Sequence, residues 1–402
     1  MNSFFIREGY PTFDDLPWTH PLSVWQGLCN RLEEVQRGLS RHPVVFVNYG
    51  GDLYAIKELP ALVGQQEFNW LSKMETERLP SVTPVGYAQT SIDGIQRSIL
   101  ITRYLDRSLP YRSLFIHSSL GRYRGHILGA MAGLLVQLHL AGFFWGDCSL
   151  SNTLFRRDAG ALQAYLVDAE TAEVHPPRLS PMLRHHDLQI MEENVHRDLI
   201  ELETSGVYLP SQTDMETGHD IRLRYRALWE EVTRDEILLT NERYRIQERI
   251  RALNLLGFSV HDVEIVETDK GEQIRLRVLV TDRNFHRDQL LELTGLEAEE
   301  MQAHKIMNEI YELRASLSQE GNRTIPLSVA SYHWLQNIYI PTVDRLKPLV
   351  VTKPQPDGNT DPVELYCQVL EHKWYLSETA RHDVGHQAAT EDFVKRFGSL
   401  GR

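Results

Sequence analysis

The stretch from His139 to Asp168 restricts the possible folds more than any other part of this sequence. It begins HLAGFFWGDCSLSNTLF and ends Leu-Val-Asp. Apolar residues recur every three or four positions before it, which predicts an amphipathic helix over about 121–142. Two β-rich runs, 153–155 and 164–167, flank a polar turn and predict a hairpin. The stretch therefore predicts a helix, a polar loop and a hairpin in direct succession.

Three polar side chains should converge on this hairpin. Asp147 lies in the loop, Asn152 opens the first strand, and Asp168 closes the second. Antiparallel pairing places those two strand ends side by side, so the three side chains should meet at one edge. An amide oxygen and two carboxylates suit Mg²⁺ that is bound together with phosphates. The plainer alternative is that they are turn and cap residues.

Because lysine is scarce, the sequence offers few candidates for a cation that binds such phosphates. Lys57 and Lys73 are the only lysines among the first 180 residues. Lys57 ends a predicted strand, and the Gly-Gly-Asp turn before that strand is typical of a hairpin over 44–57. Lys73 instead falls within a helix predicted over 62–77. Lys57 is therefore the candidate for the phosphate-binding cation.

A carboxylate is expected to position Lys57. Glu67 lies in the middle of an apolar stripe of the following helix, where an unpaired carboxylate would be costly. Pairing with Lys57 would remove that cost. Glu75 and Glu77 are less central on the same helix and are the alternative partners.

With these residues in view, about residues 30–180 resemble the protein-kinase-like superfamily. The resemblance is closest to bacterial lipopolysaccharide (Kdo/heptose) kinase-like and aminoglycoside-phosphotransferase-like proteins. The segment from Leu138 to Leu154 is close to the pattern LHxxGxxHGDxxxxNxL of that group, although Trp145 replaces its second histidine. Asp168-Ala169-Glu170 stands where protein kinases have Asp-Phe-Gly. The distal half resembles an uncharacterised helical module that follows such domains in bacteria.

The resemblance implies an ATP- and Mg²⁺-dependent phosphotransferase acting on a hydroxyl acceptor. Asp147 would orient or deprotonate the hydroxyl, and Lys57 would hold the phosphates, itself oriented by Glu67. Asn152 and Asp168 would bind the metal. Further candidate nucleotide contacts are Gly38 and Arg41 in the single-glycine segment 37–43, with Ser40 as an alternative to Arg41, and Arg103 and Tyr104.

The fold class predicted is α+β. It comprises a two-lobed kinase-like fold, with a small antiparallel sheet in the N-lobe and a mainly helical C-lobe, followed by a mostly α-helical region. The expected divisions are a lead-in over 1–24, an N-lobe over 25–105, a C-lobe core over 106–205 and an acidic helical module over 206–402. A small β-hairpin is expected within the module at about 259–280.

Charge excludes one class of partner and leaves the acceptor open. The net charge is −13, of which −12 falls in residues 181–402, so a cationic nucleic-acid binder is not expected. The sequence shows no transmembrane segment, and three dispersed cysteines favour a reducing compartment, the cytoplasm. The acceptor could be a sugar, a lipopolysaccharide-like glycan or a protein side chain, and the oligomeric state stays open.

Two other functions stay open beside the kinase. One is a nucleotide-binding pseudokinase whose acidic half binds a partner; the single-glycine segment and Trp145 favour it. The other is transfer of AMP from a nucleotide bound in the reverse orientation. Among single residues, His139 is expected to be a core histidine that holds the loop through a backbone hydrogen bond. Cys148 is expected to fill space, and Trp374, like Trp334, to lie in a core.

Overall fold

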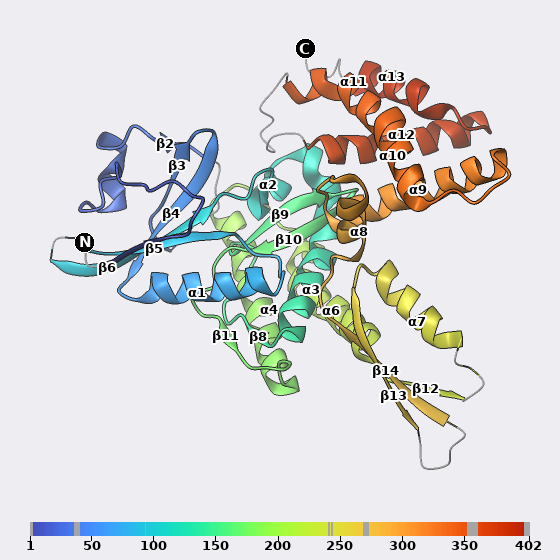
Figure 1. Cartoon of the computed structure of the whole chain (residues 1–402). Coiled ribbons are helices and arrows are strands. Elements are labelled where there is room, and N and C mark those ends of the chain that lie inside the picture. Colours follow the sequence, from blue (N-terminus) through green and yellow to red (C-terminus); the bar gives the residue numbers. More distant parts are fainter. Residues whose placement is uncertain are drawn as a thin grey trace. The chain divides into compact units, whose positions relative to one another are not determined.

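The computed structural model describes residues 3–35, 41–92, 94–239, 242, 244–267, 273–351 and 361–397. These residues form two compact units (Figure 1). The first unit comprises residues 1–156 and 164–228, and the second comprises residues 157–163 and 229–402. Residues 157–163, which belong to the hairpin that the sequence predicts after Asn152, are thus part of the second unit.

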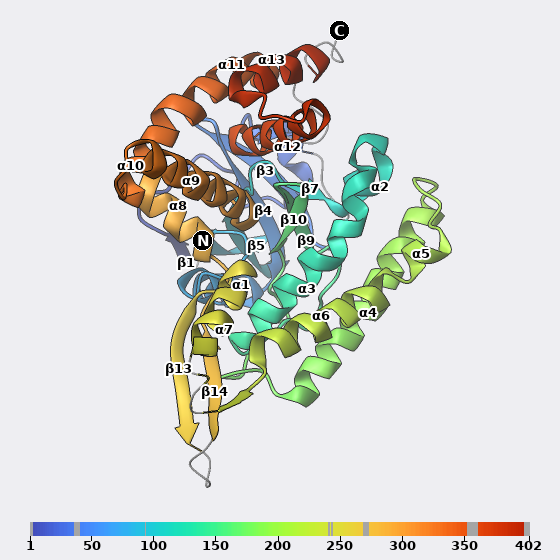
Figure 2. The same ribbon diagram turned by 90° about the vertical axis from the view of Figure 1, so that its right-hand side faces the viewer.

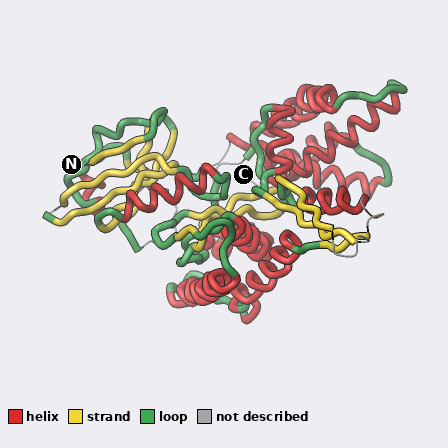
Figure 3. Tube along the Cα trace, turned by 60° about the horizontal axis from the view of Figure 1, so that its bottom comes forward, coloured by secondary structure: helices red, strands yellow, loops and turns green. Residues whose placement is uncertain are grey.

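The N-lobe of the first unit is a six-stranded antiparallel sheet with α1 (Val63–Thr76) packed on it (Figure 3). The strand order is β1-β5-β6-β4-β3-β2. The strands are β1 (Ser3–Ile6), β2 (Leu32–Glu33), β3 (Val44–Tyr49), β4 (Asp52–Pro60), β5 (Pro84–Ile92) and β6 (Ile95–Arg103). The predicted hairpin is present as β3 and β4, with Val44 opposite Lys57. Its turn needs glycine, because Gly50 and Gly51 both have positive φ.

Residues that the sequence indicated only as a polar lead-in contribute to this lobe. β1 pairs with β5, and the 3₁₀ helix η1 (Leu22–Gly27) follows. Phe13, Trp18 and Trp25 are buried in one cluster with Ile56 and Ile99 of the sheet. The hydrophobic core of the N-lobe therefore depends on the first 25 residues.

The rest of the first unit is built around α3 (Arg124–Leu140), which is buried along almost its whole length from Ile127 to His139. α4 (Pro181–Thr204) and α6 (Thr217–Thr233) lie along α3 (Figure 2). Ser180 caps α4 by accepting the Leu183 N–H, and Pro181 occupies the first turn. The remaining elements are β7 (Leu109–Pro110), α2 (Tyr111–Ile116), η2 (Ser118–Tyr123), β8 (Phe143–Phe144), β9 (Thr153–Asp158), β10 (Ala161–Leu166), β11 (Glu173–Val174) and α5 (Gln212–Met215).

The second unit is mostly helical and contains one small sheet, in the order β12-β14-β13. β13 (Val260–Glu267) and β14 (Gln273–Val280) form the hairpin that the sequence predicts, and β12 (Glu236–Leu239) adds a strand that it does not. The helices are α7 (Tyr244–Leu255), α8 (Phe285–Thr294), α9 (Glu300–Glu320), α10 (Leu327–Trp334), the π-helical turn η4 (Leu335–Tyr339), α11 (Ile340–Val351), α12 (Pro362–Ala380) and α13 (Gly385–Phe397).

The core of the second unit is formed by aromatic and aliphatic side chains from several helices. Trp334 and Tyr366 are fully buried there with Met307 and Ile310. Trp374 is not part of it: its side chain is 65% exposed, so its expected place in a core is wrong. Among the residues that the model describes, no helix is long and apolar enough to cross a membrane.

Candidate active site

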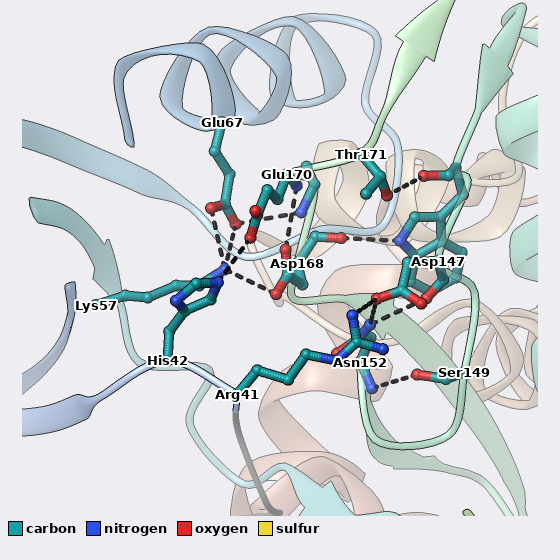
Figure 4. Close-up of polar contacts among 12 residues, drawn as sticks. Arg41, His42, Lys57, Glu67, Asp147, Ser149, Asn152, Asp168, Glu170 and Thr171 are labelled. Carbon is teal, nitrogen blue, oxygen red and sulfur yellow. Dashed lines mark hydrogen bonds and ion pairs between the residues drawn. The ribbon is translucent and has the colours of Figure 1, made fainter. Parts of the chain in front are cut away.

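Lys57 lies at the centre of an ion-pair cluster in the first unit (Figure 4). Its Nζ is 3.1 Å from Glu67 Oε2 and 2.7 Å from Asp168 Oδ2. β4 supplies the lysine, α1 supplies Glu67, and the segment after β10 supplies Asp168. The structure thus brings together three residues that are far apart in the sequence.

Glu67 is the partner that the apolar stripe predicts. It is fully buried, and its Oε1 also accepts the Ala169 N–H at 3.2 Å. Burial and the nearby charge of Asp168 raise the pKa of Glu67 to about 8, against the opposite effect of Lys57. The alternatives lie elsewhere, since Glu75 pairs with Arg7 at 2.7 Å and Glu77 with Lys73 at 3.8 Å.

Asp147 is held on both carboxylate oxygens by amide groups. Asn152 Nδ2 donates to Asp147 Oδ2 at 3.0 Å, and Asn194 Nδ2 donates to Asp147 Oδ1 at 2.9 Å. Arg41 lies 3.7 Å from Oδ2. Gly146 precedes the aspartate with φ of 77°, and a Cβ there would lie 3.0 Å from the Thr171 carbonyl oxygen. The backbone before Asp147 therefore requires glycine.

Helix α4 holds this loop with buried carboxylates. Asp187 accepts the N–H groups of Trp145 and Gly146, each at 2.9 Å. Eleven residues along, Asp198 accepts the N–H groups of Leu150 and Ser151. Burial raises the pKa of Asp198 to about 6. The loop is thus held by hydrogen bonds to carboxylates of α4.

His139 is a buried core histidine, but it does not bond the loop backbone through its side chain as expected. Its Nε2 lies 3.0 Å from Asp187 Oδ2 and its Nδ1 lies 2.8 Å from the Tyr225 hydroxyl. It therefore supports the loop through Asp187. The sequence analysis did not identify Asp187, Asn194 and Asp198, although their spacing of seven and four residues is typical of one face of a helix.

Asn152 and Asp168 meet at the base of the β9–β10 hairpin. The Val167 N–H donates to the Asn152 carbonyl at 3.1 Å, as antiparallel pairing requires. The Asn152 amide nitrogen donates to Asp147 O and Oδ2, which leaves its Oδ1 as an available oxygen. That oxygen and the Asp168 carboxylate are hard donors that fit Mg²⁺ when phosphates complete its coordination. The described residues contain no cluster of three or more His, Cys, Asp or Glu that could hold a metal unaided.

A cavity of about 460 Å³ opens beside these residues. One part of its wall is apolar and is formed by Val44, Ala55, Leu105, Leu154 and Val167. Lys57, Asp147, Asn152 and Asp168 line the polar part. Such a lining could accommodate a flat ring against its apolar part and an anion beside the lysine of its polar part.

The other candidate nucleotide contacts differ in their surroundings. Arg41 lines the cavity, while Gly38 and Ser40 lie outside the described residues. Arg103 also lines it, but its guanidinium is 3.0 Å from Asp52. Tyr104 lies at the cavity wall with its ring edge against Phe46, and burial raises its pKa.

His42 and Cys148 are close neighbours of the residues that line the polar part of the cavity. His42 Nε2 lies 3.1 Å from Glu170 Oε2, so the segment before β3 contacts the residues after Asp168. Cys148 is fully buried, and burial raises the pKa of its thiol well above the ordinary value. A buried neutral thiol is a poor nucleophile, which agrees with a space-filling role for Cys148.

Comparison with known proteins divides the chain into two matched segments. Residues 50–205 match the Lipopolysaccharide kinase (Kdo/WaaP) family, and residues 227–397 match a domain of unknown function, DUF4032. The predicted resemblance to lipopolysaccharide kinase-like proteins, followed by an uncharacterised module, is therefore confirmed. No protein with curated function matches the sequence.

Two solved structures are similar to the chain at low identity. One is titled "WaaP in complex with acyl carrier protein", with 15% identity, 63% of this chain and 98% of that chain covered, and a TM-score of 0.36. The other is an aminoglycoside-3'-phosphotransferase of type VIII, with 16% identity, 52% and 91% coverage, and a TM-score of 0.35.

Proposed function

We propose that the first unit is an ATP- and Mg²⁺-dependent phosphotransferase that acts on a hydroxyl acceptor. The observation that carries the proposal is the position of Asp147, Asn152, Asp168 and the Lys57–Glu67 pair around one cavity. The match of residues 50–205 to the lipopolysaccharide kinase family supports the same reaction class. A sugar or lipopolysaccharide-like glycan is the acceptor class that this match favours.

In the proposed reaction each residue has a separate task. Lys57, oriented by Glu67, binds the phosphates of ATP, and Asn152 and Asp168 hold the metal. Mg²⁺ would supply charge neutralisation on the phosphate oxygens. Asp147 orients the acceptor hydroxyl and takes its proton. The hydroxyl oxygen bonds to the γ-phosphorus while the bond from that phosphorus to the β,γ-bridging oxygen breaks, which releases ADP.

Radiolabelled ATP tests this proposal against its alternatives. The protein is incubated with Mg²⁺ and either γ-³²P-ATP or α-³²P-ATP, in the presence of extracted bacterial glycans. We expect γ-label in product or free phosphate, and a loss of at least about 100-fold in Asp147→Asn with ATP affinity unchanged within about three-fold. Glu173→Gln, a change of an exposed carboxylate outside the cavity lining, serves as the charge-matched control.

The other outcomes each favour a different function. Label transferred only from α-³²P-ATP would mean AMP transfer. ATP binding without any release or transfer of phosphate would favour the pseudokinase, in which the protein binds ATP as a ligand that it senses and does not consume. Turnover that is unchanged in Asp147→Asn would contradict the proposed role of this aspartate.

A further inference from the structure

Helix α4 contributes several residues to the cavity wall, among them Asn194, Arg197 and Asp198. Its buried polar residues already have partners: Asp187 and Asp198 bind loop N–H groups, and Asn194 binds Asp147. Arg197 lies three residues after Asn194, so the two side chains are neighbours on the helix surface. It is exposed and lines the cavity together with Asp147.

Arg197 differs from the other basic residues of the cavity wall in having no carboxylate partner among the residues that the structure describes. Lys57 and Arg103 lie 2.7 and 3.0 Å from aspartates, His42 lies 3.1 Å from Glu170, and Arg41 lies 3.7 Å from Asp147. Within the described parts of the chain, no hydrogen bond or ion pair involves Arg197. Its guanidinium is therefore free to bind an anion from solution.

Nearby carboxylates do not neutralise this arginine. Asp198 is occupied by the N–H groups of Leu150 and Ser151. Glu201, one helical turn beyond Arg197, lies 3.5 Å from Arg112 instead. In the described part of the chain, neither Asp198 nor Glu201 forms an ion pair with Arg197.

The two oxygens of Asp147 show on which side of the site Arg197 lies. Oδ2 faces Asn152 and hence the proposed metal and phosphates, whereas Oδ1 faces Asn194 and α4. Arg197 belongs to the α4 side, where a hydroxyl acceptor would approach the aspartate. A guanidinium in this position is suited to a carboxylate or phosphate, which it can bind through two parallel N–H groups.

We propose that Arg197 binds an anionic group of the acceptor, a carboxylate or a phosphate, close to the hydroxyl that receives phosphate. The acceptor is then an acidic molecule, and α4 selects it by charge while the same helix positions Asp147. This inference rests on the proposed phosphotransferase function, which makes the bound molecule the acceptor. Binding of the anion itself can be measured without turnover.

The test is calorimetric binding of three matched probes: glucose, glucuronate and glucose 6-phosphate. Each is titrated into the full chain with Mg²⁺ and a non-hydrolysable ATP analogue, and again without them. We expect at least one acidic probe to bind at least ten-fold more tightly than glucose, and the stronger of the two to identify the anion. Arg197→Gln should abolish this preference and change the affinity for the nucleotide analogue less than two-fold.

Arg226→Gln is the matched control, because Arg226 is an exposed arginine of α6 that does not line the cavity. It should keep the full preference. Equal binding of neutral and acidic probes, no binding of any of them, or a preference that survives in Arg197→Gln would each overturn the proposal. A failure of the proposed phosphotransferase function can be distinguished from this. The protein would then show no nucleotide binding or no transfer of the γ-phosphate, while Arg197→Gln would still weaken binding of the acidic probe.

Discussion

Lys57 has two carboxylate neighbours, and they differ in what else they do. Asp168 is partly accessible, with 24% of its side chain exposed, and it lines the cavity. Glu67 is fully buried and also accepts the Ala169 N–H. Glu67 therefore links Lys57 to the backbone next to Asp168, and its loss should disturb both.

We expect Glu67→Ala to weaken binding of Mg·ATP about ten-fold, because the lysine loses its positioning partner and the Ala169 N–H loses its acceptor. Glu67→Gln keeps a hydrogen-bond acceptor for both groups and should lose less than about three-fold. Fluorescent ATP-analogue titration measures both. Glu75→Ala, on the same helix but paired with Arg7, is the control and should bind like the wild type. Equal losses in the alanine and glutamine variants would contradict this role.

At the scale of elements, α4 organises the loop that carries Asp147. A single buried carboxylate, Asp187, accepts two loop N–H groups and contacts His139. The loop has no regular secondary structure to satisfy these N–H groups, so within the described part of the chain Asp187 supplies their acceptor through tertiary packing. The geometry of the aspartate therefore depends on the fixed position of this helix.

We expect Asp187→Ala to lower the free energy of unfolding by about 3 kcal/mol, since it leaves buried donors without an acceptor. Urea unfolding followed by circular dichroism measures this change. Glu193→Ala, at an exposed position of the same helix, should change stability by less than about 0.5 kcal/mol. A loss as small in Asp187→Ala as in this control would show that the loop does not depend on Asp187.

Local patterns were sufficient for part of the site and insufficient for the rest. The apolar stripe on one helix identified Glu67, and strand pairing identified the meeting of Asn152 and Asp168. The sequence could not show that Asp187 and Asp198 point inward, because an acidic residue on a helix is usually solvated and burial depends on the packing partner. Trp374 shows the reverse case, a large aromatic residue at a helical position that stays exposed.

At the scale of the whole molecule, the tip of the β9–β10 hairpin is part of the second unit. Asp158 accepts the Gln302 N–H at 2.8 Å, and the Ala159 N–H donates to Glu364 Oε2 at 2.8 Å. Ala159 lies in the same buried cluster as Trp334. These contacts join positions more than 140 residues apart, which is why no local pattern could reveal them.

The buried tip makes stability depend on pH. Burial, together with the charge of Glu299, raises the pKa of Asp158 to about 7 from an ordinary 3.8. The folded chain therefore holds a proton that the unfolded chain releases, and stability falls as pH rises between about 4 and 7, by at most about 1.4 kcal/mol per pH unit.

We expect Asp158→Asn to remove this part of the pH dependence, because asparagine keeps an acceptor for the Gln302 N–H and cannot ionise. Urea unfolding measures this change. Raising the pH from about 5 to about 7.5 should lower the free energy of unfolding of the wild type by about 2 kcal/mol more than that of the variant. Asp220→Asn, a change in the first turn of α6, controls for the removal of one charge. Parallel pH profiles of Asp158→Asn and the wild type would refute the prediction.

The shared hairpin also determines how this protein can be divided or recombined. A fragment that stops at Leu228 retains Lys57, Asp147, Asn152 and Asp168, but it leaves the turn at Asp158 and Ala159 without the helices that cover it. Expressed alone, the fragment needs that turn replaced by a solvent-compatible one. The same holds in evolution: a kinase-like domain could acquire or lose this module only together with a rewritten hairpin, so the two are expected to be inherited as a pair.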